Sequence, residues 1–194
     1  MSDEPHPLAG SPPGARRPPI LCVVGKKHVG KTTTVVRLSA ELTRRGHRVM
    51  ILKHGSHTFT LDPAGTDTYR HYHEGNAARV AMASPDKFAL VSRWEEELAP
   101  EGIVDRYLSD ADLVLAEGFK RSALPKLEVV RRAVFPASLW EDGVLPATSC
   151  VAMVRDTAIP GFTGVSFSLE DAAWVERCAD WIEATMLTAP PPRT

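Results

Sequence analysis

The sequence has no glutamine, a single asparagine and only three cysteines. The absence of glutamine excludes any mechanism in which a glutamine side chain orients an attacking water. The cysteines Cys22, Cys150 and Cys178 lack the spacing of a metal site. Two of them lie in apolar, strand-like runs, so we predict that all three are reduced core residues in a reducing compartment.

An excess of charge of one sign is also missing, because the formal net charge is −1. A protein without an uncompensated basic field binds polyanions poorly, so we expect no nucleic acid partner. Long apolar runs are absent as well: none approaches membrane-spanning length, and the N-terminus has no apolar segment of the signal-peptide kind. We therefore expect a soluble, cytoplasmic protein with no membrane partner.

Proline is concentrated at the two ends of the chain. Residues 1–18 hold five prolines and almost no side chains to bury, and residues 189–194 contain a run of three prolines. We predict that both segments are disordered tails. The remaining residues, 19–188, are enough for one domain with a proper core, and their composition shows no second block.

Between the tails, short apolar runs alternate with helical patterns. The predicted strands are 20–24, 48–52, 78–82, 88–94, 112–116, 126–130 and 150–154, and the predicted helices are 31–45, 95–108 and 169–186. Residues 55–65 are predicted to form a loop. This alternation predicts an α/β fold of three layers, in which a mostly parallel central sheet is flanked by helices.

The segment from Gly25 to Thr32 matches the phosphate-binding pattern G-x-x-x-x-G-K-[ST] in full. A buried strand precedes it and a helix follows it, whereas a chance glycine-rich turn would seldom have both. The glycines allow backbone N–H groups to converge on phosphate oxygens, and the helix N-terminus favours the same anion. The predicted nucleotide-binding residues here are Gly25, Lys26, Lys27, His28, Val29, Gly30, Lys31, Thr32 and Thr33. Residues 19–188 are therefore predicted to form a P-loop nucleotide-binding domain.

Two lysines inside this loop are unusual. Lys26 and Lys27 occupy positions where most P-loops carry neutral residues. A lysine directly after the first glycine resembles the P-loop of dimeric NTPases related to the signal-recognition and nitrogenase-iron proteins, where it reaches the nucleotide of the partner subunit. The alternative is that both lysines are solvated at the rim of the loop.

A P-loop site also needs a carboxylate near its Mg²⁺ ion. Asp112 and Glu117 flank the apolar run between them, and about 16 Å of extended chain keeps them apart. Ligands gather beyond the carboxyl ends of parallel strands, so we assign Glu117 to the magnesium site with Thr32 and regard Asp112 as a surface residue at the strand start. Lys31 and Glu117 are the predicted catalytic residues. Without a glutamine to orient water, we expect hydrolysis to be slow.

The base-binding residue is less clearly marked, because the guanine-reading motif N-K-x-D is absent. Asp156 follows the predicted strand 150–154 at the equivalent sheet edge. Its carboxylate could accept hydrogen bonds from the guanine ring N–H and amino group, a pairing that adenine does not offer. The alternative is an aspartate that shapes a turn.

Several motifs run in a fixed order through the chain. They are the P-loop, Lys53-His54 with His57, Asp62-Pro-Ala-Gly-Thr-Asp67, Arg70-His71 with Gly75, Leu115-Ala-Glu117-Gly-Phe-Lys120 and Pro125-Lys-Leu-Glu-Val-Val-Arg131. From about residue 20 to 186 the sequence resembles the molybdopterin-guanine dinucleotide biosynthesis adapter proteins, although Val29 stands where that family usually has a small residue. The resemblance implies a P-loop NTPase fold and a homodimer that binds GTP and Mg²⁺ and hydrolyses GTP weakly.

The resemblance also implies partners. Such proteins assist the molybdopterin guanylyltransferase that attaches GMP to molybdopterin, and they also act with molybdoenzymes that receive the cofactor. A molybdopterin-type ligand is therefore expected near the site. Arg121, Lys126, Arg131 and Arg132 are candidates for an anionic pterin phosphate or an acidic partner surface, with solvated charges as the alternative.

A polar block between the second and third predicted strands is the candidate ligand or switch loop. Its proposed members are Lys53, His54, Asp62 and Asp67, which would touch magnesium-bound water or the pterin ligand. Together with His57, His71 and His73 they could instead hold a transition metal, which would favour a metal-delivery GTPase. A small-molecule P-loop kinase is the other alternative, but residues 118–125 are short for a lid over the γ-phosphate.

Overall fold

The computed structural model describes residues 16–55, 58–60, 62–146 and 148–187. The chain divides into two compact units. The first, which we term the sheet unit, combines the chain up to His54 with the chain from Ala99 onward. The second, the hairpin unit, is Gly55–Leu98.

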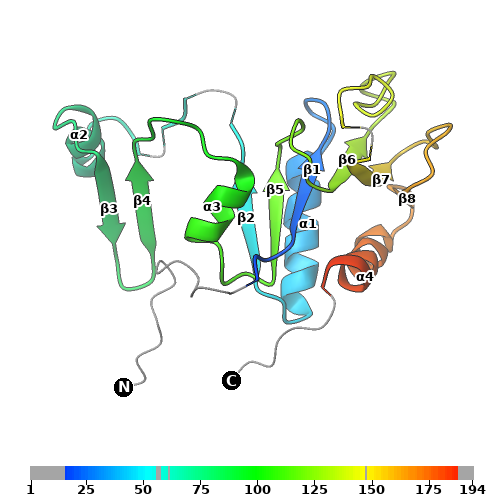
Figure 1. Cartoon of the computed structure of the whole chain (residues 1–194), viewed down its shortest axis with the longest axis horizontal. Helices are drawn as coiled ribbons and strands as arrows, with labels where there is room; N and C mark the ends of the chain where they lie inside the picture. The colour runs from blue at the N-terminus through cyan, green and yellow to red at the C-terminus, as the bar shows by residue number, and fades with distance from the viewer. Residues whose placement is uncertain (1–15, 56–57, 61, 147, 188–194) are drawn as a thin grey trace. The chain divides into compact units, whose positions relative to one another are not determined.

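The sheet unit is built on a single parallel sheet (Figure 1). Its strands are β1 (Ile20–Val24), β2 (Val49–Lys53), β5 (Leu113–Glu117), β6 (Lys126–Val130), β7 (Cys150–Arg155) and β8 (Val165–Ser168). They lie in the order β2-β5-β1-β6-β7-β8, and every neighbouring pair is parallel. Strand β1 is therefore central, and the carboxyl ends of β1, β5 and β6 meet at one edge.

Each face of this sheet carries its own apolar cluster. Helix α1 (Lys31–Arg44) and helix α4 (Trp174–Met186) pack on one face, where Leu38 and Leu42 of α1 are fully buried. Helix α3 (Pro100–Tyr107) and part of the chain after β6 cover the other face. These three layers confirm the predicted α/β fold class. None of the helices in the described part of the chain combines the length and apolar character that crossing a membrane requires.

The hairpin unit contains helix α2 (Asp67–His73) and an antiparallel pair of strands, β3 (Arg79–Ala83) and β4 (Phe88–Ser92). No residue of this unit is buried within the part of it that the structure describes. Its large apolar side chains include Met82 and Phe88, which are 58% and 48% exposed. A two-stranded hairpin without a covering layer is marginally stable in water.

The main differences from the sequence-based predictions are two elements that were not predicted and two helices that begin later. Strand β8 and helix α2 were not predicted, since β8 is a four-residue edge strand and α2 lies in a polar segment. Helix α3 begins at Pro100 rather than at residue 95, because proline fits the first turn of a helix and the preceding Ala99 is extended. Helix α4 begins at Trp174 rather than at residue 169, after a turn in which Asp171 accepts from the N–H of Ala173.

The structure also bears on the predicted tails and on the predicted place of the cysteines. Of the predicted N-terminal tail, residues 16–18 are described: Pro18 is buried and Arg17 pairs with Asp105 of α3. Residues 1–15 and the predicted tail 189–194 lie outside the described residues. The three cysteines are all free and buried, which confirms their predicted place in the core.

A charged network joins the C-terminal end of α1 to α4. The Arg45 guanidinium donates to Glu41, 2.8 Å away, and to Asp180 and Glu183 of α4, each at 2.6 Å. Hydrogen bonds from Arg44 and Arg45 lower the pKa of Glu41 from 4.5 to about 2. His47 and Arg45 likewise hold the pKa of Glu183 below its ordinary value, against the effect of burial.

We predict that Arg45→Met lowers the thermal unfolding midpoint by a few degrees, because three carboxylates lose a shared partner. The depressed pKa of Glu41 means that its contribution is complete above a pH of about 4.5 and is lost as the pH falls toward 2. The variant should therefore show a weaker pH dependence of stability across that window in calorimetry. Arg177→Met, which removes an exposed pair with Asp171, is the control, and an equal effect there would contradict the prediction.

Candidate functional site

The chain that leaves β1 makes a tight loop before α1 begins. Gly25, His28 and Gly30 have positive φ angles of 149°, 61° and 99°. A Cβ atom on Gly25 would lie 2.5 Å from the carbonyl oxygen of Val129 in β6, so only glycine fits there. The N–H of Thr34 donates to the Gly30 oxygen, which starts the helix directly after the loop. The loop therefore has the strand–turn–helix setting that a phosphate cradle requires.

Lys31 is the lysine at the end of the phosphate-binding pattern, and its side chain folds back toward the start of the loop. Its ammonium donates to the carbonyl oxygen of Lys26 at 2.6 Å. Burial lowers the pKa of Lys31, while the nearby Glu117 carboxylate raises it. Thr32 and Thr33 follow on the first turn of α1, and both are exposed.

Strand β5 brings Glu117 to the same point. Both carboxylate oxygens of Glu117 lie 3.0 Å from the Thr32 hydroxyl. The Lys53 ammonium, at the end of β2, lies 3.6 Å from one of them. Asp112, at the opposite end of β5, accepts instead from the N–H of Arg48. The structure therefore brings together Thr32 and Glu117, the two residues assigned from the sequence to one magnesium site, and keeps Asp112 away from it.

The turn after Glu117 is closely packed against His54. Gly118 has a φ of 110°, and a Cβ there would lie 3.0 Å from the Cβ of His54. Phe119 has a φ of 54°, unusual for a residue with a side chain, and its ring centroid lies 4.7 Å from that of His54. The His54 N–H also donates to the Glu117 carbonyl at 2.9 Å. His54 thus shapes the turn that follows the acid.

The other two residues of the predicted ligand loop, Asp62 and Asp67, belong to the hairpin unit. Asp67 opens helix α2, whose N-terminal Tyr69 N–H is capped by the Thr66 hydroxyl. Among the residues that the structure describes, no three histidine, cysteine or acidic side chains are grouped as a metal site. His57 lies outside those residues, and the role of Asp62 and Asp67 stays a prediction.

Asp156, the predicted base reader, follows β7. Its carboxylate accepts from the backbone N–H of Arg132 at 2.9 Å and of Ala133 at 3.3 Å. Burial raises the pKa of Asp156, but these backbone hydrogen bonds outweigh it and lower the pKa overall. Asp156 therefore ties the start of the chain after β6 to the end of β7, and its role toward a base stays a prediction.

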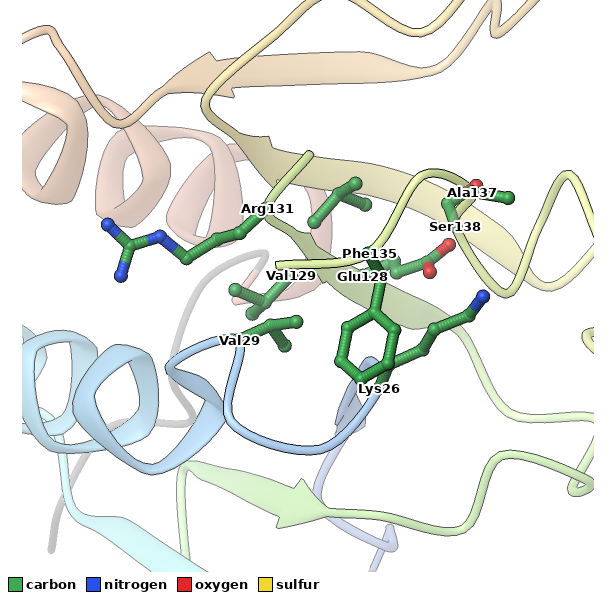
Figure 2. Close-up of a pocket in the computed structure, with 9 residues that line it drawn as sticks. Lys26, Val29, Glu128, Val129, Arg131, Phe135, Ala137 and Ser138 are labelled. Atoms are coloured by element: carbon green, nitrogen blue, oxygen red, sulfur yellow. The ribbon is translucent and has the colours of Figure 1, made fainter. Parts of the chain in front are cut away.

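Lys26 is not a solvated residue at the loop rim. Its ammonium forms an ion pair with Asp142 at 2.7 Å and lies 5.4 Å from the Phe135 ring centroid. Both partners belong to the chain after β6, and Figure 2 shows Lys26 and Phe135 beside Val29 in a pocket next to the P-loop. Lys27, in contrast, is exposed. Nothing in the sequence pattern pointed to Asp142 or Phe135.

The basic residues after β5 do not form one surface. Lys126 is fully buried, and its ammonium donates to the carbonyl oxygens of Ser122 and Leu124. The prediction that Lys126 contacts an anionic ligand or a partner surface is therefore wrong. Arg132 pairs with Glu141 at 2.6 Å. Arg121 and Arg131 are exposed.

The central parallel strand, the glycine-rich turn and the acid on the adjacent strand define an α/β protein with the P-loop architecture. The family model described as "Molybdopterin guanine dinucleotide synthesis protein B" matches residues 20–156. The chain belongs to this family, as its motifs predicted.

Two similar proteins are named as adapter proteins of the same biosynthesis. The chain is 32% identical over 117 residues to the molybdopterin-guanine dinucleotide biosynthesis adapter protein of Haemophilus influenzae. It is 34% identical over 116 residues to the protein of that name from Escherichia coli. These matches cover 59% and 58% of this chain and 64% and 66% of the two relatives, so the chain spans slightly less than two thirds of their length.

Solved structures agree over a larger share of the chain. A crystal structure of molybdopterin-guanine biosynthesis protein B is 31% identical, covers 86% of this chain and 98% of its own, and has a TM-score of 0.67. The structure of Bacillus subtilis MobB has a TM-score of 0.65 at 21% identity, covering 88% of this chain and 99% of its own. The latter similarity shows the fold alone.

We predict that Gly25→Ala destabilises the protein by roughly 1–3 kcal/mol, because a methyl group at this φ meets the carbonyl of Val129. Chemical denaturation measures the loss. Gly102→Ala in α3 is the matched control, since a Cβ there meets no atom within 4 Å. Equal stability of the two variants would show that the Gly25 turn tolerates a side chain.

Proposed function

We propose that this protein is a GTP-binding accessory protein of molybdopterin guanine dinucleotide biosynthesis. The observation that carries the proposal is the pairing of Glu117 with Thr32 beside the P-loop, in a chain that belongs to this family. The same pairing would serve any P-loop nucleotide, and family membership favours GTP.

The residues present fit a nucleotide and Mg²⁺. The Gly25 turn approaches β6 too closely for any side chain, which leaves backbone N–H groups to line the loop. Thr32 and Glu117 supply hard oxygen atoms of the kind that Mg²⁺ prefers. Bound Mg²⁺ supplies positive charge that offsets the charge of the β- and γ-phosphates.

The chain's own residues have separate roles in this proposal. Lys31 would bring its ammonium to the terminal phosphates, and Thr32 and Glu117 would hold the metal. Glu117 is the one acid that the structure places at Thr32 among the described residues, so it also orients the attacking water. With no glutamine in the chain, turnover is slow and the protein acts mainly as a binding protein.

The proposed partners follow from the names of the relatives, which are described as adapters in this biosynthesis. They are a molybdopterin guanylyltransferase, a molybdopterin-type ligand and the molybdoenzymes that receive the cofactor. We further propose a homodimer. The hairpin unit supports it, because its apolar side chains, among them Met82 and Phe88, are exposed in the single chain and would gain burial against a second copy.

We predict that Lys31→Met weakens GTP binding roughly 10- to 100-fold, because it removes a charge-assisted contact to phosphate. Isothermal titration calorimetry of the full chain with GTP, in Mg²⁺ buffer, measures this. Arg177→Met should bind as the unmodified protein does. Unchanged affinity in Lys31→Met would overturn the P-loop assignment.

The same titration with ATP as competitor distinguishes the proposal from a small-molecule kinase. A clear preference for GTP supports the adapter function and directs attention to Asp156. A preference for ATP would favour the kinase, and dimerisation that depends on a transition metal rather than Mg²⁺ would favour metal delivery.

We predict that Glu117→Gln keeps its affinity for GTP in the absence of Mg²⁺ but loses Mg²⁺-dependent turnover roughly 10- to 100-fold. The physical reason is that an amide is a weaker ligand for Mg²⁺ than a carboxylate. Phosphate release under single-turnover conditions provides the measurement. Turnover equal to that of the unmodified protein would remove Glu117 from its proposed role.

A further inference from the structure

Lys126 has no part in the site as proposed, yet it is the largest fully buried side chain among the residues that the structure describes. It opens β6, between Cys22 of β1 and Cys150 of β7. Removing an ammonium group from water is costly, and burial accordingly lowers the pKa of Lys126. A lysine at such a position has to make contacts that offset this cost.

The contacts of Lys126 lead to the loop between β5 and β6, which starts directly after Glu117. The ammonium donates to the carbonyl oxygens of Ser122 at 2.6 Å and Leu124 at 2.8 Å. These oxygens are backbone acceptors, so the lysine draws the loop backbone together from inside the core. The charge therefore acts on the shape of this loop.

Ser122 continues the connection toward the acid. Its N–H and its hydroxyl both donate to the carbonyl oxygen of Phe119, each at 3.0 Å. Phe119 is the residue with a positive φ that packs on His54, two positions after Glu117. A conformation of this kind is strained and persists only where its surroundings fix it. Lys126 and Ser122 fix it from one side and His54 from the other.

We propose that Lys126 is a positioning residue for the metal site: its buried ammonium, bonded to the carbonyls of Ser122 and Leu124, holds the 118–125 loop so that the Glu117 carboxylate stays at Thr32. It acts through the loop and touches neither nucleotide nor metal. This inference rests on the proposed function, because a fixed Glu117 matters only if the site binds Mg²⁺ with a nucleotide.

Lys126→Met tests the proposal, because methionine has a similar length and no charge. The gain from removing a buried charge opposes the cost of leaving the Ser122 and Leu124 carbonyls without their donor, so the thermal unfolding midpoint should change by only a few degrees. The loop should loosen nonetheless. We expect amide hydrogen exchange to accelerate in residues 118–125 and to stay unchanged in α1 and α4.

The functional readout is the affinity for Mg²⁺, measured as the change in GTP affinity between saturating Mg²⁺ and chelator. We expect Lys126→Met to bind GTP without Mg²⁺ as the unmodified protein does, and to lose at least tenfold in Mg²⁺ affinity. Cys150→Ala is the matched control, since it loosens the core beside Lys126 and leaves the hydrogen bonds of the loop in place. Should Lys126→Met fail to fold, Ser122→Ala removes the hydroxyl's bond to the Phe119 carbonyl and its contact with the Cys22 thiol, and a smaller loss of Mg²⁺ affinity is expected.

The outcomes separate the two claims. If the unmodified protein binds no GTP, the proposed function fails and the positioning role fails with it. If it binds GTP with Mg²⁺, and Lys126→Met shows neither faster loop exchange nor weaker Mg²⁺ binding, only the inference is overturned. An equal loss in Cys150→Ala would also overturn it, because the effect would then be a general loosening of the core.

Discussion

The buried position of β1 is the constraint on which the phosphate loop depends. All five residues of this strand are buried, because β5 and β6 flank it and helices cover both faces of the sheet. The chain that leaves β1 must turn at once, and Gly25 makes this turn against the Val129 carbonyl of β6. On the other side, β5 ends at the same edge and delivers Glu117 to Thr32. The order of strands, rather than proximity in sequence, therefore assembles the site.

Charged side chains hold the loops at this edge together with the apolar side chains that pack on the sheet. The buried Glu128 accepts from the N–H groups of Leu139 and Trp140 at 2.5 and 3.1 Å, although burial raises its pKa. Asp156 accepts from two N–H groups at the start of the chain after β6, and Lys126 donates to two carbonyls near the end of the loop between β5 and β6. Loop backbone carries many polar groups, so a charge that gathers several of them is an effective anchor. These charges therefore add to the apolar packing that holds the loops around the P-loop.

The two units of the chain are stabilised very differently. The sheet unit has an apolar cluster on each face of its sheet. The described residues of the hairpin unit include none that is buried, and within the described part of the chain β3 and β4 pair with each other alone. Two strands and a seven-residue helix cannot bury enough surface to offset the entropy of ordering the chain. This imbalance is the physical basis for expecting a second copy to cover the hairpin.

The sequence by itself determined the P-loop, the buried strand before it, the helix after it and Glu117 at the end of β5. Each of these follows from a local pattern of glycine, apolar periodicity or a polar residue closing an apolar run. The sequence did not predict β8 and α2, because a four-residue edge strand and a short polar helix show little hydrophobic periodicity. Only the tertiary structure decided that Lys126 is buried and that Lys26 pairs with Asp142. The partners of these charges lie on loops whose path depends on long-range packing, which no local pattern records.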